Sequence, residues 1–166
     1  MTALVVMGPS GCGKTTLGLA LAEALGWTYV DGDALHPPQN IAKMRAGGAL
    51  DDADRAPFLD NVARSIASSA GIGIVLSCSA LKRAYRDAIR DNADRPVCFV
   101  LPVVSREVLH TRVSERGGHF MPASLVDSQL EDLEPLGDDE DAIVVSGNVT
   151  TEAQVRRVLA ALESRL

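Results

Sequence analysis

The feature that most constrains this chain is a glycine-rich segment between an apolar run and an amphipathic run. The segment reads GPSGCGKT at residues 8–15 and matches the pattern GxxxxGK[ST] in full. The apolar residues 3–7 predict a buried strand, and the apolar face along Lys14–Leu25 predicts a helix, with Gly26 as its C-cap. A strand, a glycine loop and a helix in this order predict a loop that wraps a phosphate chain.

The residue types in this loop point to a nucleoside triphosphate. Glycines let the backbone take positive φ values, so successive amides can approach phosphate oxygens, and the helix N-terminus adds positive potential. We expect the Lys14 ammonium to reach the β- and γ-phosphates and the Thr15 hydroxyl to be a ligand of Mg²⁺. The expected ATP-binding residues are Gly8, Pro9, Ser10, Gly11, Cys12, Gly13, Lys14, Thr15 and Thr16. The motif alone leaves ATPases, GTPases, small-molecule kinases and regulatory modules open.

The rest of the chain alternates short apolar runs with amphipathic segments. Strands are expected at residues 28–30, 72–77, 97–103 and 142–146, and helices at 39–45, 57–69, 82–92, 105–116, 122–133 and 152–166. Near-continuous apolar runs are typical of parallel strands buried on both faces. The pattern therefore predicts one three-layer α/β domain over residues 1–166. Residues 117–136 are either a lid or an ordinary connecting helix.

Composition excludes several classes of function. The chain is 46% hydrophobic and 23% charged, which is typical of a globular protein. A net charge of −6 and an aromatic content of 4% argue against a nucleic-acid partner. The cysteines, Cys12, Cys78 and Cys98, form no CxxC pair, which favours a reducing, cytoplasmic location. No apolar run reaches the length of about 20 residues that a membrane span needs.

Two carboxylates follow the second predicted strand. Asp31 and Asp33 flank a glycine there, and the carboxyl ends of parallel strands face the ligand crevice. One carboxylate is suited to hold the Mg²⁺ shell and the other to orient a substrate hydroxyl. The alternative is a turn in which an aspartate caps the next segment. We expect the acidic residues 51–55 to form a solvated turn before a helix that begins at Pro57.

Basic residues recur four positions apart on later predicted helices. Lys82 and Arg86 would share one helix face and suit an anionic substrate, or they form a solvated face. Arg112 and Arg116 would clamp phosphates, or they are ordinary surface charge. For Cys12, one hypothesis is that the phosphate loop favours a reactive thiolate. The other is that this small side chain points away from the loop.

Four sequence blocks together resemble one kinase family. They read GPSGCGKT at 8–15, DGDALHPPQNIAKMRAGGALDDADRAPFL at 31–59, CSALKRAYRDAIR at 78–90 and RVSERGGHFMPASLVDSQLEDLEP at 112–135. The chain resembles the gluconate kinases of the P-loop, shikimate-kinase-like group over nearly its whole length. One departure is Phe58, which stands where the family leads us to expect tryptophan.

This resemblance implies a fold and an activity. It implies a P-loop kinase fold with a five-stranded parallel sheet, flanking helices and a lid at about 117–136. It also implies ATP-dependent phosphorylation of D-gluconate at its 6-hydroxyl, with Mg²⁺, and leaves a homodimer possible. The alternatives are a kinase of the same fold acting on another small acid such as shikimate, or an ATP-sensing module.

The resemblance also implies roles for particular residues. Asp33 becomes the ligand of the substrate hydroxyl and the candidate base, and Asp31 a water-mediated partner of Mg²⁺. Arg116, with Lys14 and Asp33, is expected to act in catalysis and, with Arg112, to contact phosphate. The implied sugar-acid contacts are His36, Arg55, Lys82 and Arg86, in addition to Asp33. Gln129 and His119 lie inside the matching blocks but receive no role.

Overall fold

A computed structural model describes residues 2–69, 71, 73–115 and 123–165 of the chain. The strands are β1 (Ala3–Val6), β2 (Thr28–Asp31), β3 (Ile74–Ser77), β4 (Val97–Val103) and β5 (Ala142–Ser146). The helices are α1 (Lys14–Leu25), the 3-10 helix η1 (Gly32–Leu35), α2 (Pro38–Arg45), α3 (Asp52–Ser68), α4 (Arg83–Asn92), α5 (Arg106–Glu115), α6 (Ala123–Asp132) and α7 (Thr151–Glu163). Each strand is followed by one or more helices, as the sequence predicts.

The strands form one five-stranded parallel sheet in the order β2-β3-β1-β4-β5. β1 lies at its centre, where Leu4 is paired with Val75 of β3 and with Cys98 of β4. All residues of β1 are buried, which explains why its sequence is an uninterrupted apolar run. Because the strands are parallel, the loops that follow them meet at one edge of the sheet.

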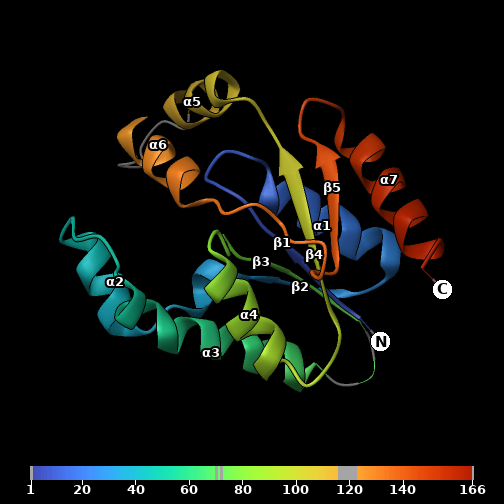
Figure 1. Cartoon of the computed structure of the whole chain (residues 1–166), viewed down its shortest axis with the longest axis horizontal. Coiled ribbons are helices and arrows are strands. Elements are labelled where there is room, and N and C mark those ends of the chain that lie inside the picture. Colours follow the sequence, from blue (N-terminus) through green and yellow to red (C-terminus); the bar gives the residue numbers. More distant parts are fainter. Residues whose placement is uncertain (1, 70, 72, 116–122, 166) are drawn as a thin grey trace.

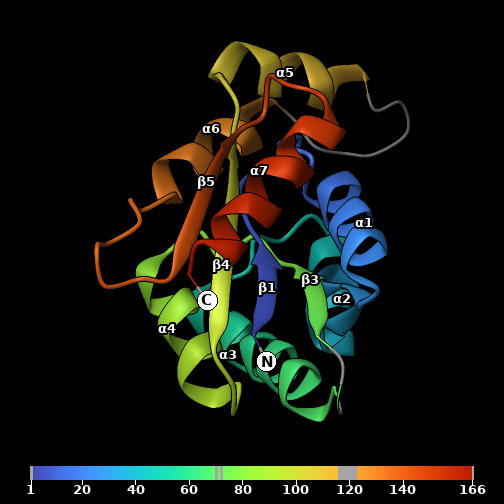
Figure 2. The same cartoon turned by 90° about the vertical axis from the view of Figure 1, so that its right-hand side faces the viewer.

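Helices cover both faces of the sheet and its carboxyl edge (Figures 1 and 2). Alternate residues of β1 point to opposite faces, so Val5 packs in the core with α3 and α4, and Leu4 packs in the core with α1 and α7. A third, smaller core joins α5 to α6 through Leu109, Val113 and Val126. The three-layer α/β prediction is therefore confirmed, with α5 and α6 placed above the carboxyl ends of the strands.

One predicted helix start, that of α3, is wrong by several residues, and local capping explains the difference. α3 begins at Asp52, so Pro57 lies inside the helix and the acidic residues 51–55 are its start, not a solvated turn. The Asp51 and Asp54 side chains each accept a hydrogen bond from the other's backbone amide, which forms a capping box. Acidic groups in the first turn also complement the helix dipole. α7 begins at Thr151, one residue before the predicted start at 152, and the Thr150 side chain caps it.

The close approach of β2 and β3 at their carboxyl ends requires glycine at position 32. A Cβ atom added to Gly32 would lie 2.0 Å from the backbone oxygen of Ser77, at the end of β3. Only a residue without a side chain fits there. Gly32 therefore holds the flanking carboxylates of Asp31 and Asp33 beside the end of β3.

We predict that Gly32→Ala destabilises the fold, because the oxygen that the new Cβ would meet belongs to the backbone of a central strand. Overpacking of this kind costs about 1–3 kcal/mol, which a urea unfolding curve would measure. Ala34→Ser, at an exposed position of η1, is the matched control and should change the free energy of unfolding little. Equal stabilities of Gly32→Ala and the wild type would contradict the crowding argument.

Candidate active site

The glycine loop between β1 and α1 has the geometry of an anion site. Gly8, Gly11 and Gly13 have φ values of 127°, 85° and 98°, in the region that favours glycine. A Cβ atom on Gly13 would meet no atom of the described residues within 4 Å, so this side of the loop is open. Among the described residues, no side chain caps the start of α1. The loop thus fits a phosphate chain at the helix N-terminus.

Lys14 lies over this loop, as the motif predicts. Its Nζ donates hydrogen bonds to the backbone oxygens of Gly8 and Pro9 at 3.0 and 3.1 Å. Thr15 and Thr16 follow in the first turn of α1 and are exposed. The ammonium therefore lies at the loop, where phosphate oxygens can replace its carbonyl partners, and two exposed threonines follow it in the chain.

Cys12 points away from the mouth of the loop. It is 2% exposed, its Sγ lies 3.8 Å from the Met7 backbone oxygen, and it packs with Leu109 and Val113 of α5. Burial raises the pKa of its thiol, although Lys14 opposes this effect. The hypothesis of a reactive thiolate is therefore wrong, and the small side chain fills the core between the loop and α5.

Helix α6 also contacts the loop, and sequence reasoning assigned no role to the residue responsible. Gln129 accepts a hydrogen bond from the backbone amide of Ser10 through its Oε1 atom, at 2.7 Å. Asp127 of the same helix binds Arg106 and His110 of α5. The predicted lid segment thus includes a helix that is attached both to α5 and to the glycine loop, while Arg116 and residues 117–122 lie outside the described residues.

A cleft beside the loop is suited to the nucleoside. It has a volume of about 370 Å³, and it extends from Gly11 and Thr16 to Arg112. The Arg112 guanidinium donates to the backbone oxygens of Gly11 and Gly147, at 3.2 and 3.1 Å, and so ties the loop to the connection after β5. Sequence reasoning missed Glu115, which lies on α5 with Arg112, and four residues that follow β5, namely Gly147, Val149, Thr151 and Gln154. The single signal for these four is that they follow the last predicted strand.

The two carboxylates after β2 have different environments. Asp31 accepts hydrogen bonds from the Asp33 amide at 3.1 Å and from the Ser77 hydroxyl at 3.4 Å, so it caps η1. The capping alternative is therefore realised for Asp31, whose side chain nevertheless remains exposed at the carboxyl edge. Asp33 is exposed and borders a separate cavity.

That cavity brings together residues from three parts of the chain. Asp33 and His36 follow β2, Arg55 lies on α3, and Tyr85 lies on α4. The loop after β3, residues 78–81, closes the remaining side. Its volume of about 30 Å³ has room for about one water molecule, so a larger ligand must displace the walls.

His36 is held against an aromatic ring. It stacks on Phe58 with ring centroids 3.8 Å apart and an angle of 11° between the planes. Burial lowers the pKa of His36; Asp33 opposes this shift and Arg55 adds to it. Phe58 is buried, and it serves as the platform where the family resemblance leads us to expect tryptophan.

Two cations lie near the ring of Tyr85. The Arg55 guanidinium and the Lys82 Nζ are 5.5 and 5.6 Å from the ring centroid. Lys82 also forms ion pairs with Asp52 at 3.5 Å and with Asp132 at 3.9 Å. The Tyr85 hydroxyl donates to Asp52, and this hydrogen bond together with the charge of Lys82 holds the pKa of Asp52 below its ordinary value. The position of Asp52 therefore shows that a carboxylate fits beside these cations.

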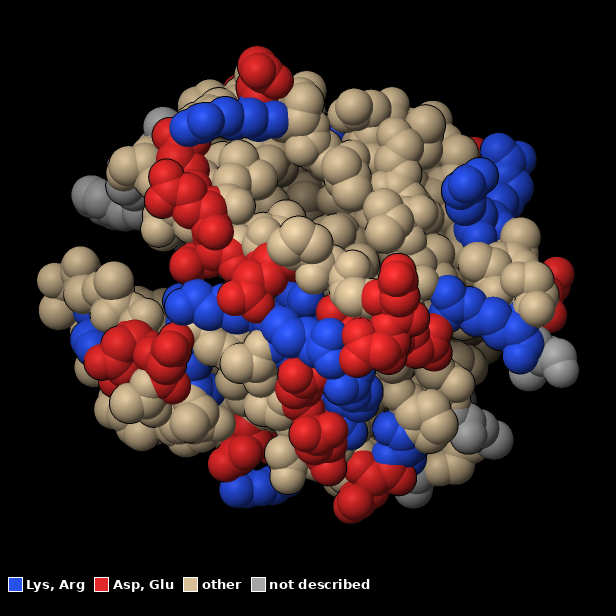
Figure 3. All heavy atoms as spheres, in the orientation of Figure 1, with Lys and Arg blue, Asp and Glu red and all other residues tan. Residues whose placement is uncertain are grey.

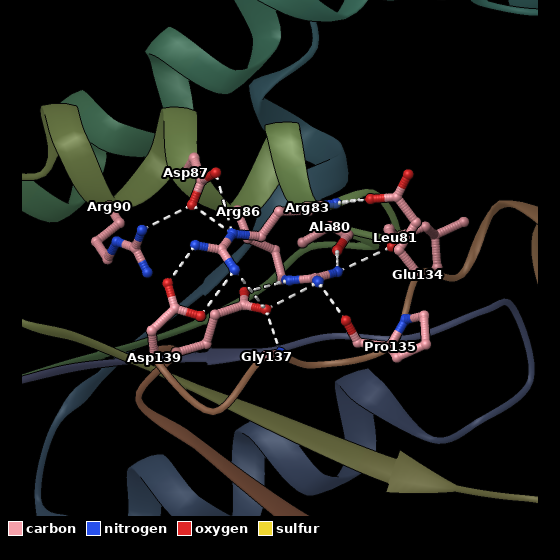
Figure 4. A network of polar contacts seen from close by, with 11 residues as sticks. Ala80, Leu81, Arg83, Arg86, Asp87, Arg90, Glu134, Pro135, Gly137 and Asp139 are labelled. Atoms are coloured by element: carbon pink, nitrogen blue, oxygen red, sulfur yellow. Dashed lines mark hydrogen bonds and ion pairs between the residues drawn. The ribbon is translucent and has the colours of Figure 1, made fainter.

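Arg86 does not belong to this cavity wall. Its side chain is 0% exposed, and its guanidinium binds Glu140 and three backbone oxygens (Figure 4). The expectation of a sugar-acid contact is corrected, because a side chain with no exposed surface and so many partners has no face for a substrate. The four-residue spacing misleads here because Lys82 precedes α4 as its extended N-cap.

Known proteins resemble this chain over most of its length. The family model described as AAA domain matches residues 4–136. The gluconokinase of Gluconobacter oxydans is 53% identical over 148 residues, which cover 87% of this chain and 82% of that protein. The chain belongs to the gluconokinase family. The crystal structure of a gluconokinase from Sinorhizobium meliloti agrees, with 44% identity, a TM-score of 0.87 and coverage of 98% and 92% of the two chains.

A more distant structure supports the fold of this gluconokinase family member. Shikimate kinase from Aquifex aeolicus is 18% identical and has a TM-score of 0.65, with 99% of this chain and 98% of that chain covered. This likeness confirms the shikimate-kinase-like architecture. In the described part of the chain, no helix combines the length and apolar character that crossing a bilayer requires.

Charged side chains of both signs cover the face of the protein on which α4 lies. In Figure 3, Lys and Arg side chains alternate with Asp and Glu side chains across the middle of this face. The alternation reflects ion pairs such as those of Arg83 with Asp87 and Asp139. The cations of this face therefore neutralise neighbouring carboxylates within the molecule.

We predict that the imidazole of His36 titrates below its ordinary pKa of 6.5, because burial disfavours the charged form. Above pH 6.5 the imidazole is mostly neutral in both the folded and the unfolded chain, so its titration does not reduce the free energy of unfolding there. As the pH falls below that value, the unfolded chain takes up the proton first, so the free energy of unfolding decreases. A ¹H–¹⁵N NMR titration gives the pKa, and urea unfolding at pH 7.0 and 5.5 gives the stability change.

The control for this prediction is His36→Gln, which retains His110 and His119 and removes only this titration. The difference in unfolding free energy between the two pH values should be smaller in the variant. An imidazole of His36 that titrates at or above 6.5 would contradict the proposed burial effect.

Proposed function

We propose that this protein catalyses the ATP-dependent phosphorylation of D-gluconate at the 6-hydroxyl, giving 6-phospho-D-gluconate. One observation carries the proposal: in a chain of the gluconokinase family, a cavity with Asp33, Arg55 and a neutral histidine lies beside the glycine loop at one edge of the sheet. The cavity offers a carboxylate for a hydroxyl and cations for an acid. A single domain and a cytoplasmic location complete the proposal, and the latter fits three free, buried cysteines.

The glycine loop performs the first part of the mechanism, which is to hold the triphosphate. Its amides and the N-terminus of α1 are suited to the phosphate oxygens, and Lys14 supplies a full positive charge. The adjoining cleft, bounded by Arg112, is suited to the nucleoside. Phosphoryl transfer depends mainly on such positioning and charge stabilisation.

The residues at this edge also fit Mg²⁺. The Thr15 hydroxyl and the Asp31 carboxylate, directly or through water, would hold it, and both are exposed oxygen donors. Among the described residues, no group of three or more His, Cys, Asp or Glu side chains is arranged to hold a metal ion. This suits a cation that takes most of its ligands from phosphates and water. When bound, Mg²⁺ neutralises charge on the β- and γ-phosphate oxygens.

The acceptor side orients the sugar acid. Asp33 accepts a hydrogen bond from the 6-hydroxyl and takes its proton as transfer proceeds. Arg55 and Lys82 bind the carboxylate at the other end of the molecule, replacing part of the contact that Asp52 now makes with Lys82. Neutral His36 is suited to hydrogen-bond the hydroxyls between them. Because the cavity is small, its walls must move apart to admit gluconate. Once they close around the bound sugar acid, they exclude water.

We predict that Asp33→Asn lowers kcat for gluconate by about 10²–10⁴-fold, the range of general-base contributions. The cavity of Asp33, His36, Arg55 and Tyr85 is called the acceptor cavity, because it is proposed to bind gluconate. The KM for ATP should change little, because Asp33 borders this cavity. A coupled assay of ADP release measures both constants, and Asp60→Asn, at an exposed position of α3, is the control. A raised KM for ATP with high residual kcat would instead assign Asp33 to the metal.

We predict that Lys82→Gln weakens selection for acids. Loss of a charge-assisted contact should raise the KM for gluconate about tenfold or more and leave that for neutral sorbitol unchanged. The measurement is ADP release over a panel of gluconate, sorbitol and shikimate, with Arg156→Gln on the exposed face of α7 as the charge-matched control. Preference of the wild type for shikimate, or ADP release that no acceptor stimulates, would overturn the proposed function. An unchanged KM ratio in Lys82→Gln would remove Lys82 from the acid site.

A further inference from the structure

Arg86 is a fully buried cation that the proposed mechanism does not use. Its side chain and that of Glu140 are both 0% exposed. Its guanidinium donates at 2.6 and 3.0 Å to the Glu140 carboxylate, at 2.9 Å to the Leu81 oxygen, at 3.3 Å to the Ala80 oxygen and at 3.1 Å to the Pro135 oxygen. Figure 4 shows this guanidinium between the start of α4 and the connection that leads from α6 to β5.

The first two of these backbone oxygens belong to the acceptor cavity. Ala80 and Leu81 line it, in the loop between β3 and α4. Ala80 has a φ of 43°, a left-handed conformation that costs free energy for a residue with a side chain. The preceding residue, Ser79, accepts a hydrogen bond from the Gly8 amide of the phosphate loop at 3.1 Å. This strained loop therefore touches both the acceptor cavity and the phosphate loop.

The other partners belong to the α6–β5 connection, residues 133–141. Within it, Pro135 supplies an oxygen and Glu140 a carboxylate to Arg86. The connection also binds the strained loop directly, through the Glu134 amide and the Leu81 oxygen at 2.9 Å. The Glu134 carboxylate accepts the backbone amide of Arg83 and so caps α4. One guanidinium thus joins the cavity loop to the segment that follows α6.

Stability alone is a weak explanation for this arrangement. A buried ion pair is often no more stabilising than apolar side chains of similar volume, because both charges lose their water. A guanidinium offers five N–H donors in a fixed plane, whereas a lysine offers a single movable ammonium. The arginine supplies geometry, since one planar group binds two loop oxygens and three oxygens of the connection. Burial raises the pKa of Glu140, but the hydrogen bonds from Arg86 and the Gly137 amide outweigh burial and keep the pKa below its ordinary value.

We infer that Arg86 is a positioning residue for the acceptor substrate, and that Glu140 orients its guanidinium. Arg86 fixes Ala80 and Leu81 in the conformation that shapes the cavity, and it couples this wall to the α6–β5 connection. The inference rests on the proposed function in one respect, namely that the cavity binds gluconate. Without these donors the loop spends less time in the binding conformation, and the apparent affinity for the acceptor falls by that fraction.

A neighbouring ion pair offers a matched control. Arg83, on the same helix, binds Asp139 of the same connection at 2.6 Å. Their side chains are 35% and 66% exposed, and in the described structure the Arg83 side chain donates no hydrogen bond to the oxygens of Ala80 or Leu81. Arg83 also forms an ion pair with Glu140 at 3.7 Å, which is longer than the 2.6 Å contact between Arg86 and Glu140. Removal of this pair loosens the connection without releasing the loop. This control therefore separates the effect of a loosened α6–β5 connection from the effect of a released cavity loop.

The experiment compares two double variants, Arg86→Met/Glu140→Leu and Arg83→Gln/Asp139→Asn. The first removes both buried charges together, so neither is left unpaired. It should raise the KM for gluconate about tenfold or more through the lost loop contacts and keep the KM for ATP within about twofold. The second should keep both KM values within about twofold. Hydrogen exchange should become faster in residues 78–82 in the first variant only.

Several results would overturn the inference. These are an unchanged KM for gluconate in Arg86→Met/Glu140→Leu, an equal rise in the control, or an equal rise in both KM values. If the apolar variant fails to fold, Arg86→Lys replaces it, because it keeps the charge and loses the planar set of donors. If the wild type fails to phosphorylate gluconate, the proposed function fails. Exchange at residues 78–82 then tests Arg86 alone, and unchanged rates there would reject its role.

Discussion

β1 forms hydrogen bonds with β3 on one side and β4 on the other, and this parallel pairing determines where the functional side chains lie. It brings the glycine loop after β1 beside the loop after β3, where the Gly8 amide binds Ser79. The pairing of β2 with β3 adds Asp33 to the same edge. Nucleotide and acceptor can therefore meet without any large movement of the sheet itself.

Much of the fold could be predicted because the signals are local. Strands buried on both faces are continuous apolar runs, and α1 has the predicted bounds because the loop motif fixes its start and Gly26 its end. The start of α3 was missed because Pro57 suggested a first turn. The competing signal, Asp51 followed three residues later by Asp54, was present but is a weaker form of the usual capping pattern.

The site was predictable only where the chain carries a motif. Lys14 lies where the loop pattern places it, whereas the directions of other side chains depend on tertiary packing. Arg86 turns inward because Glu140, far along the chain, offers a buried carboxylate. Cys12 turns inward because α5 supplies an apolar surface. The cleft wall after β5 carries no sequence motif, so the sequence alone does not reveal that these residues border a cleft.

The strand order also has a consequence for the newly synthesised chain. β1 is made first, yet its partners are completed only when residues 74–77 and 97–103 have emerged from the ribosome. Until then a short, wholly apolar segment has no place to be buried. Pairing over such sequence distances is slow, and exposed apolar strands promote aggregation. Chaperone access during synthesis is therefore most valuable before β4 has emerged, when the strand that later forms the centre of the sheet is still unpaired.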